Sequence, residues 1–241
     1  MSTSPTVSIV NASLRYPDKI LFENLNFQLA ASQTTCLLGP SGIGKSRFLQ
    51  LIAGLNGTST ISTSDQKGLQ GRLAYMPQTH TLLPWLTVLN NTVLGYRLRR
   101  TYKPYVKALA LLKQLGLGDA LTKYPAQLSG GMQQRVALAR VLLENRPIVL
   151  MDEPFSALDT ITRYQLQEIT AYALKKRTVL LITHDPLEAL RLGHHIAIMS
   201  GYPAKITVIP CALQDSPPRS LNNPDLLQWQ AKLLHHLQEL Q

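Results

Sequence analysis

The eight residues 39–46 (GPSGIGKS) follow a short apolar run and fit the pattern G-x-x-x-x-G-K-[ST] in full. This pattern binds the phosphates of nucleotides. Its glycines let the backbone turn around a phosphate so that several N–H groups point inward. A helix that begins directly after the loop adds its positive N-terminal end. We therefore predict a nucleotide phosphate site here rather than an ordinary glycine-rich turn.

Two residues of this loop carry specific chemistry. Lys45 brings a full positive charge to the terminal phosphates, and the hydroxyl of Ser46 offers a ligand to Mg²⁺. Arg47 stands where a second hydroxyl residue is common, and its charge either adds a phosphate contact or points to solvent. The residues of this segment that we expect to bind ATP are Gly39, Pro40, Ser41, Gly42, Ile43, Gly44, Lys45, Ser46 and Arg47.

An acidic pair, Asp152 and Glu153, ends the apolar run from Ile148 to Met151. Ligands of α/β sheets bind at the carboxyl ends of the strands, where such a pair would lie. Asp152 can hold Mg²⁺ through a water or through Ser46. Glu153 can polarise a water for attack on the γ-phosphate. The alternative is a capping pair before a proline, and the phosphate loop in the same chain favours the catalytic interpretation.

These residues need strands and helices to hold them. Short apolar or alternating runs predict strands at 7–10, 22–29, 34–38, 148–151, 178–183, 196–199 and 206–208. Helical spacing predicts helices at 48–55, 87–96, 105–115, 129–143, 160–174 and 225–240. The segment 56–71 is rich in Gly, Ser and Thr and holds one strand at most. The order predicts an α/β fold: a mostly parallel phosphate-loop core, a small antiparallel β layer and a helical insert.

Composition limits the other function classes. The 241 residues include 24 Lys+Arg and 14 Asp+Glu, a net charge of +10, and 45% are hydrophobic, which excludes disorder as a description of the whole chain. Two cysteines, Cys36 and Cys211, are too few for a disulfide framework or a four-cysteine zinc site. The stretch Leu73 to Tyr96 carries no Lys, Arg, Asp or Glu, but its prolines and polar residues argue against a membrane span.

Residues 66–118 contain no acid and eight basic residues. A solvated helical face is the first interpretation of this stretch. A face turned toward anionic lipid headgroups or a membrane partner is the second. Nucleic acid is the least favoured, because no motif for reading nucleic acid accompanies the charge.

The run Leu128 to Arg135 (LSGGMQQR), called the signature run below, is the most specific motif outside the phosphate loop. Ser129 can cap the following helix, which then presents free N–H groups to an anion. With these motifs the chain resembles, over nearly its whole length, the ATP-binding subunits of ABC transporters. A plain helix cap does not explain the whole run. The resemblance implies that four residues contact the ATP held by a partner subunit: Ser129, Gly130, Gly131 and Met132.

The same resemblance implies further site residues. Tyr16 matches an aromatic that stacks on adenine, although a lone tyrosine is more often a packing residue. Gln78 matches a glutamine that reaches the metal and the attacking water. Asp159 ends SALD, which resembles a loop that crosses the dimer interface, and His184 follows a buried strand and resembles a γ-phosphate contact. The expected catalytic residues are Glu153, His184 and Gln78, and the expected metal ligands are Ser46, Gln78 and Asp152.

The implied organisation is one ABC ATPase domain over 1–241. A nucleotide-binding core with the β layer takes 1–86 and 146–214, a helical subdomain with the signature run takes 87–145, and a helical tail takes 215–241. Two departures from the family pattern stand out: the segment 56–71 is short and polar, and Met132 replaces a more common glutamine. Neither departure affects a catalytic group.

The implied function is ATP hydrolysis that powers solute transport. The expected cofactors are ATP and Mg²⁺. The expected partners are a second ATPase subunit, either an identical chain, which is favoured, or a paralogue, an integral-membrane permease and, through the permease, an extracytoplasmic solute-binding protein; no nucleic acid is expected. Leu82, Leu83 and Trp85 are either exposed anchors for the permease or core residues of the helical subdomain. The expected location is the cytoplasmic face of the inner membrane, as a peripheral subunit.

A narrower resemblance, carried by residues 82–93 and 201–206, is to the importers of nitrate, sulfonates, taurine and thiamine precursors. The alternative function is a soluble ABC ATPase acting in DNA repair or translation. Such proteins need a coiled-coil insert, a zinc insert or two ATPase units, and none of these fits in this chain. A phosphate-loop kinase or GTPase of another family is opposed by the signature run.

Overall fold

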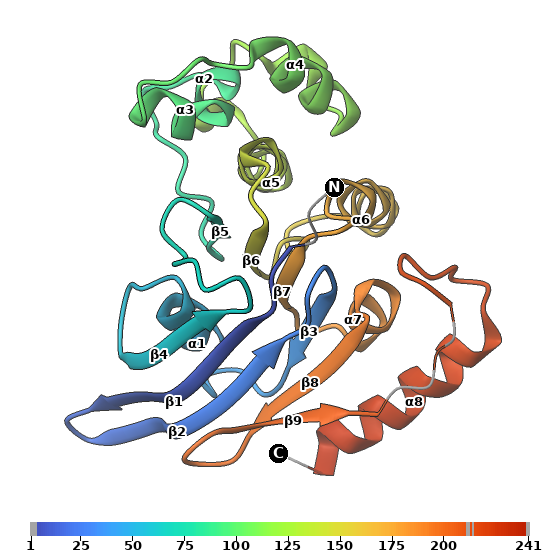
Figure 1. Cartoon of the computed structure of the whole chain (residues 1–241). Coiled ribbons are helices and arrows are strands. Elements are labelled where there is room, and N and C mark those ends of the chain that lie inside the picture. Colours follow the sequence, from blue (N-terminus) through green and yellow to red (C-terminus); the bar gives the residue numbers. More distant parts are fainter. Residues whose placement is uncertain (1–3, 211–212, 214, 240–241) are drawn as a thin grey trace. The chain divides into compact units, whose positions relative to one another are not determined.

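The structure, a computed structural model, describes residues 4–210, 213 and 215–239, so Cys211 and the predicted helix end at Leu240 lie outside the described residues. The chain forms two compact units (Figure 1). The first comprises Met1–Leu73, Arg146–Glu153 and Lys175–Gln241. The second comprises Ala74–Asn145 and Pro154–Leu174. The predicted α/β class is confirmed, and each unit is described separately below.

The first unit contains a small antiparallel sheet of β1 (Val7–Tyr16), β2 (Lys19–Leu29) and β4 (Thr58–Thr63), in the order β2-β1-β4. The strand predicted at 7–10 is longer than expected. Asn11 has φ 53° and the register shifts there, so burial passes from Val7 and Ile9 to Ala12 and Leu14. The bulge changes the phase of the alternation, which hid the second half of the strand from the sequence pattern.

The main sheet supplies the edge on which the site is built. Within the first unit its strands are β6 (Ile148–Asp152), β7 (Thr178–Ile182), β3 (Thr34–Leu38), β8 (His195–Ser200) and β9 (Lys205–Ile209), in that order. All neighbours are parallel except β8 and β9. β6 and β7 are buried at every residue, which explains their continuous apolar sequences.

The register of this sheet brings three strand ends level. Ile182 pairs with Leu37 on one side and with Asp152 on the other. The residues that follow β3, β6 and β7 therefore leave the sheet at the same edge. These residues are the phosphate loop, Glu153 and the segment that carries His184.

Three helices complete the first unit: α1 (Lys45–Ile52), α7 (Pro186–Leu192) and α8 (Pro224–Glu239). Phe48 of α1 meets Phe22 and Phe27 of β2 edge-on, with ring centroids 5.9 and 6.0 Å apart, so α1 packs on the antiparallel layer. α7 was not predicted, because it has only seven residues. Asp185 caps it by accepting from the N–H of Leu187 at 2.9 Å, and Pro186 fits its first position.

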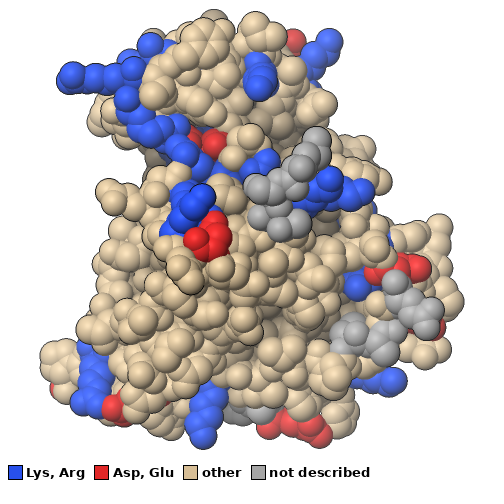
Figure 2. Space-filling model, in the orientation of Figure 1, with Lys and Arg blue, Asp and Glu red and all other residues tan. Residues whose placement is uncertain are grey.

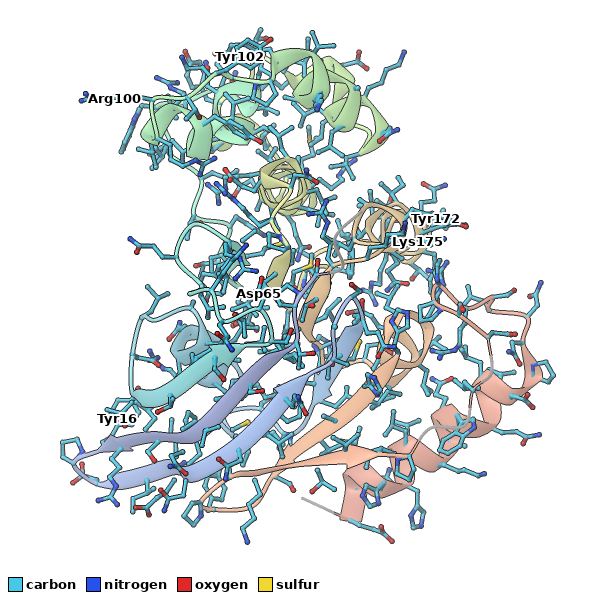
Figure 3. All side chains as sticks on the ribbon, in the orientation of Figure 1. Tyr16, Asp65, Arg100, Tyr102, Tyr172 and Lys175 are labelled. Carbon is cyan, nitrogen blue, oxygen red and sulfur yellow. The ribbon has the colours of Figure 1, made fainter. Side chains whose placement is uncertain are left out.

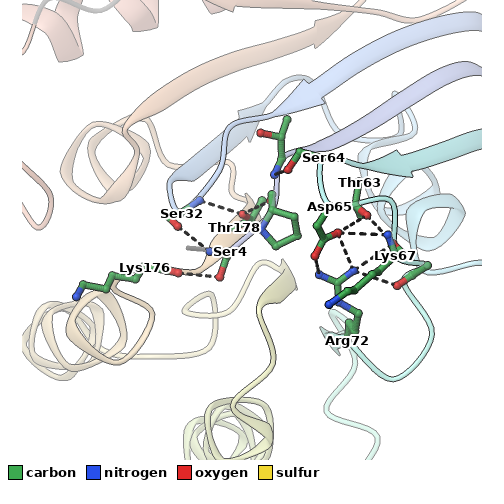
Figure 4. Close-up of polar contacts among 12 residues, drawn as sticks. Ser4, Ser32, Thr63, Ser64, Asp65, Lys67, Arg72, Lys176 and Thr178 are labelled. Carbon is green, nitrogen blue, oxygen red and sulfur yellow. Dashed lines mark hydrogen bonds and ion pairs between the residues drawn. The ribbon is translucent and has the colours of Figure 1, made fainter. Parts of the chain in front are cut away.

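The loop after β4 is held by a polar cluster (Figure 4). Asp65 accepts from the Thr63 hydroxyl at 2.7 Å and from Arg72 Nη2 at 2.6 Å. These hydrogen bonds lower the pKa of Asp65 to about 2. A second group ties the strand ends together: Thr178 Oγ1 accepts from the N–H of Ser32 at 3.0 Å, and Ser4 Oγ donates to the carbonyl of Lys176 at 2.7 Å.

The second unit is mainly helical. Its helices are α2 (Val88–Thr92), α3 (Leu94–Leu98), α4 (Tyr105–Gln114), α5 (Gly130–Glu144) and α6 (Thr160–Ala173). Two 3₁₀ turns, Gly118–Ala120 and Pro125–Gln127, precede α5. The single helix predicted at 87–96 is wrong, because Val93, at φ −91° and ψ 13°, separates α2 from α3.

The strand β5 (Leu73–Met76) spans the division between the two units and was not predicted, since four residues of mixed polarity carry little periodicity. Among the described residues, no helix is long and apolar enough to cross a membrane. Basic side chains are prominent on the visible face (Figure 2), and Arg97, Arg100 and Lys107 of the acid-free stretch are exposed. Arg99, which follows α3, forms an ion pair with Glu144 at 2.8 Å.

Candidate functional site

The phosphate loop requires glycine at its two ends. Gly39 has φ 147°, and a Cβ there would lie 2.3 Å from the carbonyl oxygen of Met199 on β8. Gly44 has φ 114° and is the N-cap of α1. No side chain caps the first turn of α1, so its N–H groups are available to an anion. The loop thus has the conformation that the sequence pattern predicts.

Lys45 lies across this loop. Its Nζ donates to the carbonyls of Gly39 at 2.7 Å and Pro40 at 2.8 Å, and the residue is only 7% exposed. Burial lowers the pKa of Lys45, while the charges of Glu153 and Asp152 oppose that shift. The amine therefore sits at the loop mouth with two neutral acceptors, and a phosphate would be a stronger acceptor for the same donor.

Asp152 is the buried carboxylate of the site. It is 2% exposed, and its Oδ1 has no hydrogen-bond partner. Burial raises the pKa of Asp152, and a hydrogen bond with Ser46 partly offsets the shift. An orphaned, charged oxygen beside a hydroxyl is costly unless a cation or water occupies the space next to it. The pair Asp152 and Ser46 therefore fits Mg²⁺.

The kind of metal site is limited by the surroundings. Among the described residues, no group of three or more His, Cys, Asp or Glu side chains could hold a metal ion. Mg²⁺ commonly binds through one or two protein oxygens while phosphates and waters complete its shell. The residues present suit a metal that arrives with a nucleotide, not a resident metal held by protein alone.

Glu153 and His184 form the next part of the site. Glu153 has φ 48°, an uncommon value for a residue other than glycine, and its N–H donates to the carbonyl of Ile182 at 2.9 Å. This bond continues the pairing of β6 with β7 by one residue, and the left-handed backbone of Glu153 then turns the chain away from the strand. The Nδ1 of His184 lies 3.4 Å from Glu153 Oε2, and the His184 side chain is 63% exposed. The two predicted catalytic side chains are thus neighbours at the sheet edge.

Tyr16 is the last residue of β1, and its ring is 44% exposed (Figure 3). An exposed ring is able to stack on a base. Stacking on adenine stays a prediction. Arg47 donates to Gln50 Oε1 at 3.1 Å on the surface of α1, so it is held beside the loop by a neighbour one turn on.

The signature run lies in the second unit, at the start of α5. Ser129 Oγ accepts from the N–H of Met132 at 3.3 Å, as an N-cap does. A Cβ on Gly131 would lie 3.0 Å from the carbonyl oxygen of Ala157, so this glycine lets α5 approach the segment 156–159 closely. The predicted contacts of Ser129, Gly130, Gly131 and Met132 with a partner's ATP stay predictions.

Gln134 is a positioning residue that the sequence analysis missed. It is 1% exposed, its Oε1 accepts from the N–H of Ala157 at 2.9 Å, and its Nε2 donates to Ser156 Oγ at 3.4 Å. It fixes the start of α5 to the loop before α6. Asp159 ends that loop and caps α6 by accepting from the N–H of Thr162 at 3.0 Å, which lowers the pKa of Asp159.

The segment after β5 carries the remaining predicted residues. Gln78 is exposed two residues beyond β5, and its predicted contact with metal and water stays a prediction. Trp85 is 69% exposed, so it is not a core residue of this unit, whereas Leu82 and Leu83 are half-buried. Asn91, fully buried, holds the segment: its Oδ1 accepts from the N–H of Leu83 at 2.8 Å.

Comparisons with known proteins agree with this geometry. A family model described as ABC transporter matches residues 22–156. An uncharacterized ABC transporter ATP-binding protein of Haemophilus influenzae is 39% identical, with 96% of this chain and 98% of that protein covered. The aliphatic sulfonates import ATP-binding protein SsuB of Bacillus subtilis is 36% identical, with 91% and 88% covered.

A solved structure is similar over most of the chain. It is described as a dimeric structure of a post-hydrolysis state of an ATP-binding cassette bound to ADP and Pi. It is 27% identical with a TM-score of 0.73, and the match covers 89% of this chain and all of that chain, 100%. The mixed α/β architecture is therefore that of a nucleotide-binding cassette.

Proposed function

This chain belongs to the ABC transporter family, and we propose that the loop 39–46, Asp152, Glu153 and His184 form the nucleotide-contacting half of its ATPase site. The protein is an ATP-binding subunit that binds ATP with Mg²⁺ and hydrolyses ATP to power import. The alternative of a DNA repair or translation ATPase is not favoured, because several relatives are import subunits.

The observation that carries the site assignment is the orphaned Oδ1 of Asp152 next to the phosphate loop. A buried carboxylate with a raised pKa and an oxygen without a partner costs folding free energy, and such groups cluster at functional sites. Its neighbours are the hydroxyl of Ser46 and the amine of Lys45, which are groups that a metal-bound triphosphate needs.

Each residue has a definite task in the proposed site. Lys45 exchanges its two carbonyl acceptors for phosphate oxygens, and the N–H groups of α1 add to that contact. Asp152 and Ser46 would hold the metal, which would supply Lewis-acid stabilisation of the negative charge on the phosphates. Glu153 orients a water toward the γ-phosphorus and polarises it.

His184 has the geometry of a support for Glu153. At 3.4 Å its Nδ1 is close enough to hold the carboxylate in place, and its exposure leaves it free to turn toward a γ-phosphate. The main-chain bond from Glu153 to Ile182 fixes the carboxylate's starting position on the strand edge. A base that is held at its site is worth about 10²–10⁴ in rate.

The other half of each site comes from a second subunit in this proposal. Ser129 to Met132 of a partner chain, in head-to-tail two-fold symmetry, would close over the γ-phosphate. Support comes from the position of the signature run at the capped start of α5 and from the similar cassette that is described as dimeric. Gln78 would join the metal and water from its own chain, and Asp159 would lie near the dimer interface.

We further propose that the subunit works with an integral-membrane permease, on the cytoplasmic face of the membrane, and receives signals from an extracytoplasmic solute-binding protein through that permease. The exposed ring of Trp85 supports a contact with the permease. The transported solute belongs to the class of small molecules such as nitrate, sulfonates, taurine or thiamine precursors. The SsuB relatives, named for aliphatic sulfonates, support this class.

The experiment that tests the site is Lys45→Ala in the full chain. Loss of one charge-assisted phosphate contact costs about 2–4 kcal/mol, which weakens fluorescent-ATP binding by roughly 30-fold or more. Phosphate release should fall with it. The matched control is Lys175→Ala, an exposed lysine of the same unit, which should bind and hydrolyse as the parent does. Unchanged affinity in Lys45→Ala would remove the phosphate-loop assignment.

A further inference from the structure

A pocket of about 270 Å³ lies in the first unit, next to the C-terminal helix α8. It is apart from the phosphate loop in sequence, and none of its lining residues belongs to the predicted ATP site. One wall is formed by α7 and by the strands β8 and β9, and the other by one face of α8. The lining residues are Leu190, Ile196, Ile209, Pro210, Trp229, Lys232, Leu233 and His236.

The interior of the pocket is apolar. Leu190 and Ile196 are fully or almost fully buried, Leu233 is 3% exposed, and the indole of Trp229 is half-buried. Ligand sites of drug-like size start at about 300 Å³ and are lined mainly by apolar and aromatic side chains, with a few polar groups. This pocket therefore suits a compact body of a few carbon atoms or one aromatic ring.

The mouth of the pocket carries positive charge. The Nζ of Lys232 lies 4.9 Å from the centre of the Trp229 ring, and Lys232 and His236 are exposed one turn apart on α8. Glu239 lies 3.6 Å from His236 but does not line the pocket. Among the described lining residues there is no Asp or Glu, so an anion at the mouth would meet the ammonium of Lys232 with no carboxylate in the pocket lining itself.

The wall opposite α8 is fixed in place. The Nη1 of the buried Arg219 donates to the carbonyls of Leu190 at 2.5 Å and Gly193 at 2.7 Å, which closes the C-terminal end of α7. Asp185 closes the other end. Leu190 therefore presents its side chain from a helix held at both ends, and a ligand would not have to order this wall.

We propose that this pocket binds a small amphipathic anion: an acyl or aryl group that fills the apolar interior, with one carboxylate or phosphate-type head at Lys232. The apolar lining selects the body, and the ammonium selects the sign of the head group. The bound group would bridge α8 and α7, and α7 begins directly after His184 and its neighbour Asp185. This inference does not depend on the ATPase assignment, because the test measures binding alone.

Trp229 provides the measurement. The chain has two tryptophans, so a Trp85→Phe background leaves Trp229 as the only indole. Octanoate is titrated into this full-length protein while its tryptophan emission is recorded, and octylammonium and acetate are titrated in parallel. We expect a saturable change with octanoate and a Kd below about 1 mM. Octylammonium, with the opposite charge, and acetate, without the chain, should bind at least about tenfold more weakly.

Two variants assign the binding to the pocket. Lys232→Gln removes the charge at an exposed position and should weaken octanoate at least about fivefold, while the melting temperature stays unchanged. Lys175→Gln, an exposed lysine that does not line the pocket, should bind octanoate as the background protein does (Figure 3). Absence of saturable binding to about 10 mM, equal binding of octylammonium, or normal binding by Lys232→Gln would each overturn the proposal.

Discussion

At the scale of single residues, the site contains three features that lower the stability of the fold and bring no benefit in the absence of a ligand. Asp152 is a buried acid with an unpaired oxygen, Lys45 is a buried amine, and Glu153 has a left-handed backbone conformation. Such features cluster where binding or catalysis repays them. These residues lie close together at the ends of β3, β6 and β7, and we therefore place the chemistry at this edge of the sheet.

The raised pKa of Asp152 predicts how the stability of the fold changes with pH. A folded-state pKa above the unfolded value means that the native state holds the proton more tightly, so stability falls as pH rises from the unfolded pKa near 4 through the folded pKa. Burial disfavours the ionised form of this carboxylate and so raises its pKa. Asp152→Asn should therefore raise the melting temperature at pH 7. The expected gain in the free energy of unfolding is about 0.5–2 kcal/mol.

The gain should shrink at pH below about 4, where Asp152 of the parent is protonated in both states. Thermal melts across pH 3 to 8 measure it, without nucleotide or metal. Asp119→Asn, an exposed acid, serves as control and should shift the melt little. A lower melting temperature for Asp152→Asn at pH 7 would show that the carboxylate is already compensated and would weaken the metal assignment.

At the scale of elements, the features that could be predicted from the sequence were those formed by residues adjacent in the chain. The phosphate loop, the acidic strand end and the α5 cap are runs of adjacent residues with strong patterns, so they were predictable. α7 and β5 were missed because they are short, and they form through tertiary packing: Ala189 and Leu190 of α7 are fully buried. The split between α2 and α3 depends on one backbone conformation at Val93, which no side-chain pattern records.

Gln134 shows the same limit within the site. Its partners, Ser156 and Ala157, are 22 and 23 residues away in sequence. A single buried glutamine in an amphipathic helix carries no sign of such a contact. The contact connects the start of α5 to the segment 156–159. The signature residues and Asp159 are therefore held together within the second unit.

Gln134→Met should test that bracing. The substitution keeps the length of the side chain but leaves the N–H of Ala157 without its acceptor. A buried donor left unpaired costs about 1–3 kcal/mol, so the melting temperature should fall measurably. Gln165→Met on the exposed face of α6 is the matched control and should melt as the parent does. An unchanged melt in Gln134→Met would mean that these hydrogen bonds do not hold the segment.

At the scale of the whole molecule, the proposed function gives the chain two surfaces with different tasks. One is the nucleotide edge of the first unit; the other is the segment 82–88 of the second unit, where Trp85 is exposed and Asn91 holds the loop beneath it.

Trp85→Ala separates the two surfaces. Since the ring is 69% exposed, its loss should leave the melting temperature and isolated ATP binding almost unchanged. Assembly with the permease, measured by co-purification in detergent, should fall. Tyr102→Ala removes an even more exposed ring, 84%, from the same unit and should not affect assembly. Normal co-purification of Trp85→Ala would end its role as an anchor.

In the proposed site, one chain supplies the phosphate loop and the catalytic carboxylate while a second chain supplies Ser129 to Met132. Glu153→Gln keeps the size of the side chain and the nucleotide ligands but removes the carboxylate that polarises water, so turnover should fall by about 10²–10⁴. ATP should then be trapped between two chains. Glu168→Gln, an exposed acid on α6, is the control with normal turnover.

Size-exclusion chromatography with Mg²⁺ and ATP, combined with phosphate release on the same samples, measures both consequences. We expect Glu153→Gln to form a stable dimer that contains ATP. Adding Ser129→Arg should abolish this dimer, because the larger side chain enters the place of the γ-phosphate contact. A Glu153→Gln protein that stays monomeric at high concentration and hydrolyses ATP at the parent rate would contradict both the catalytic role of Glu153 and the shared site.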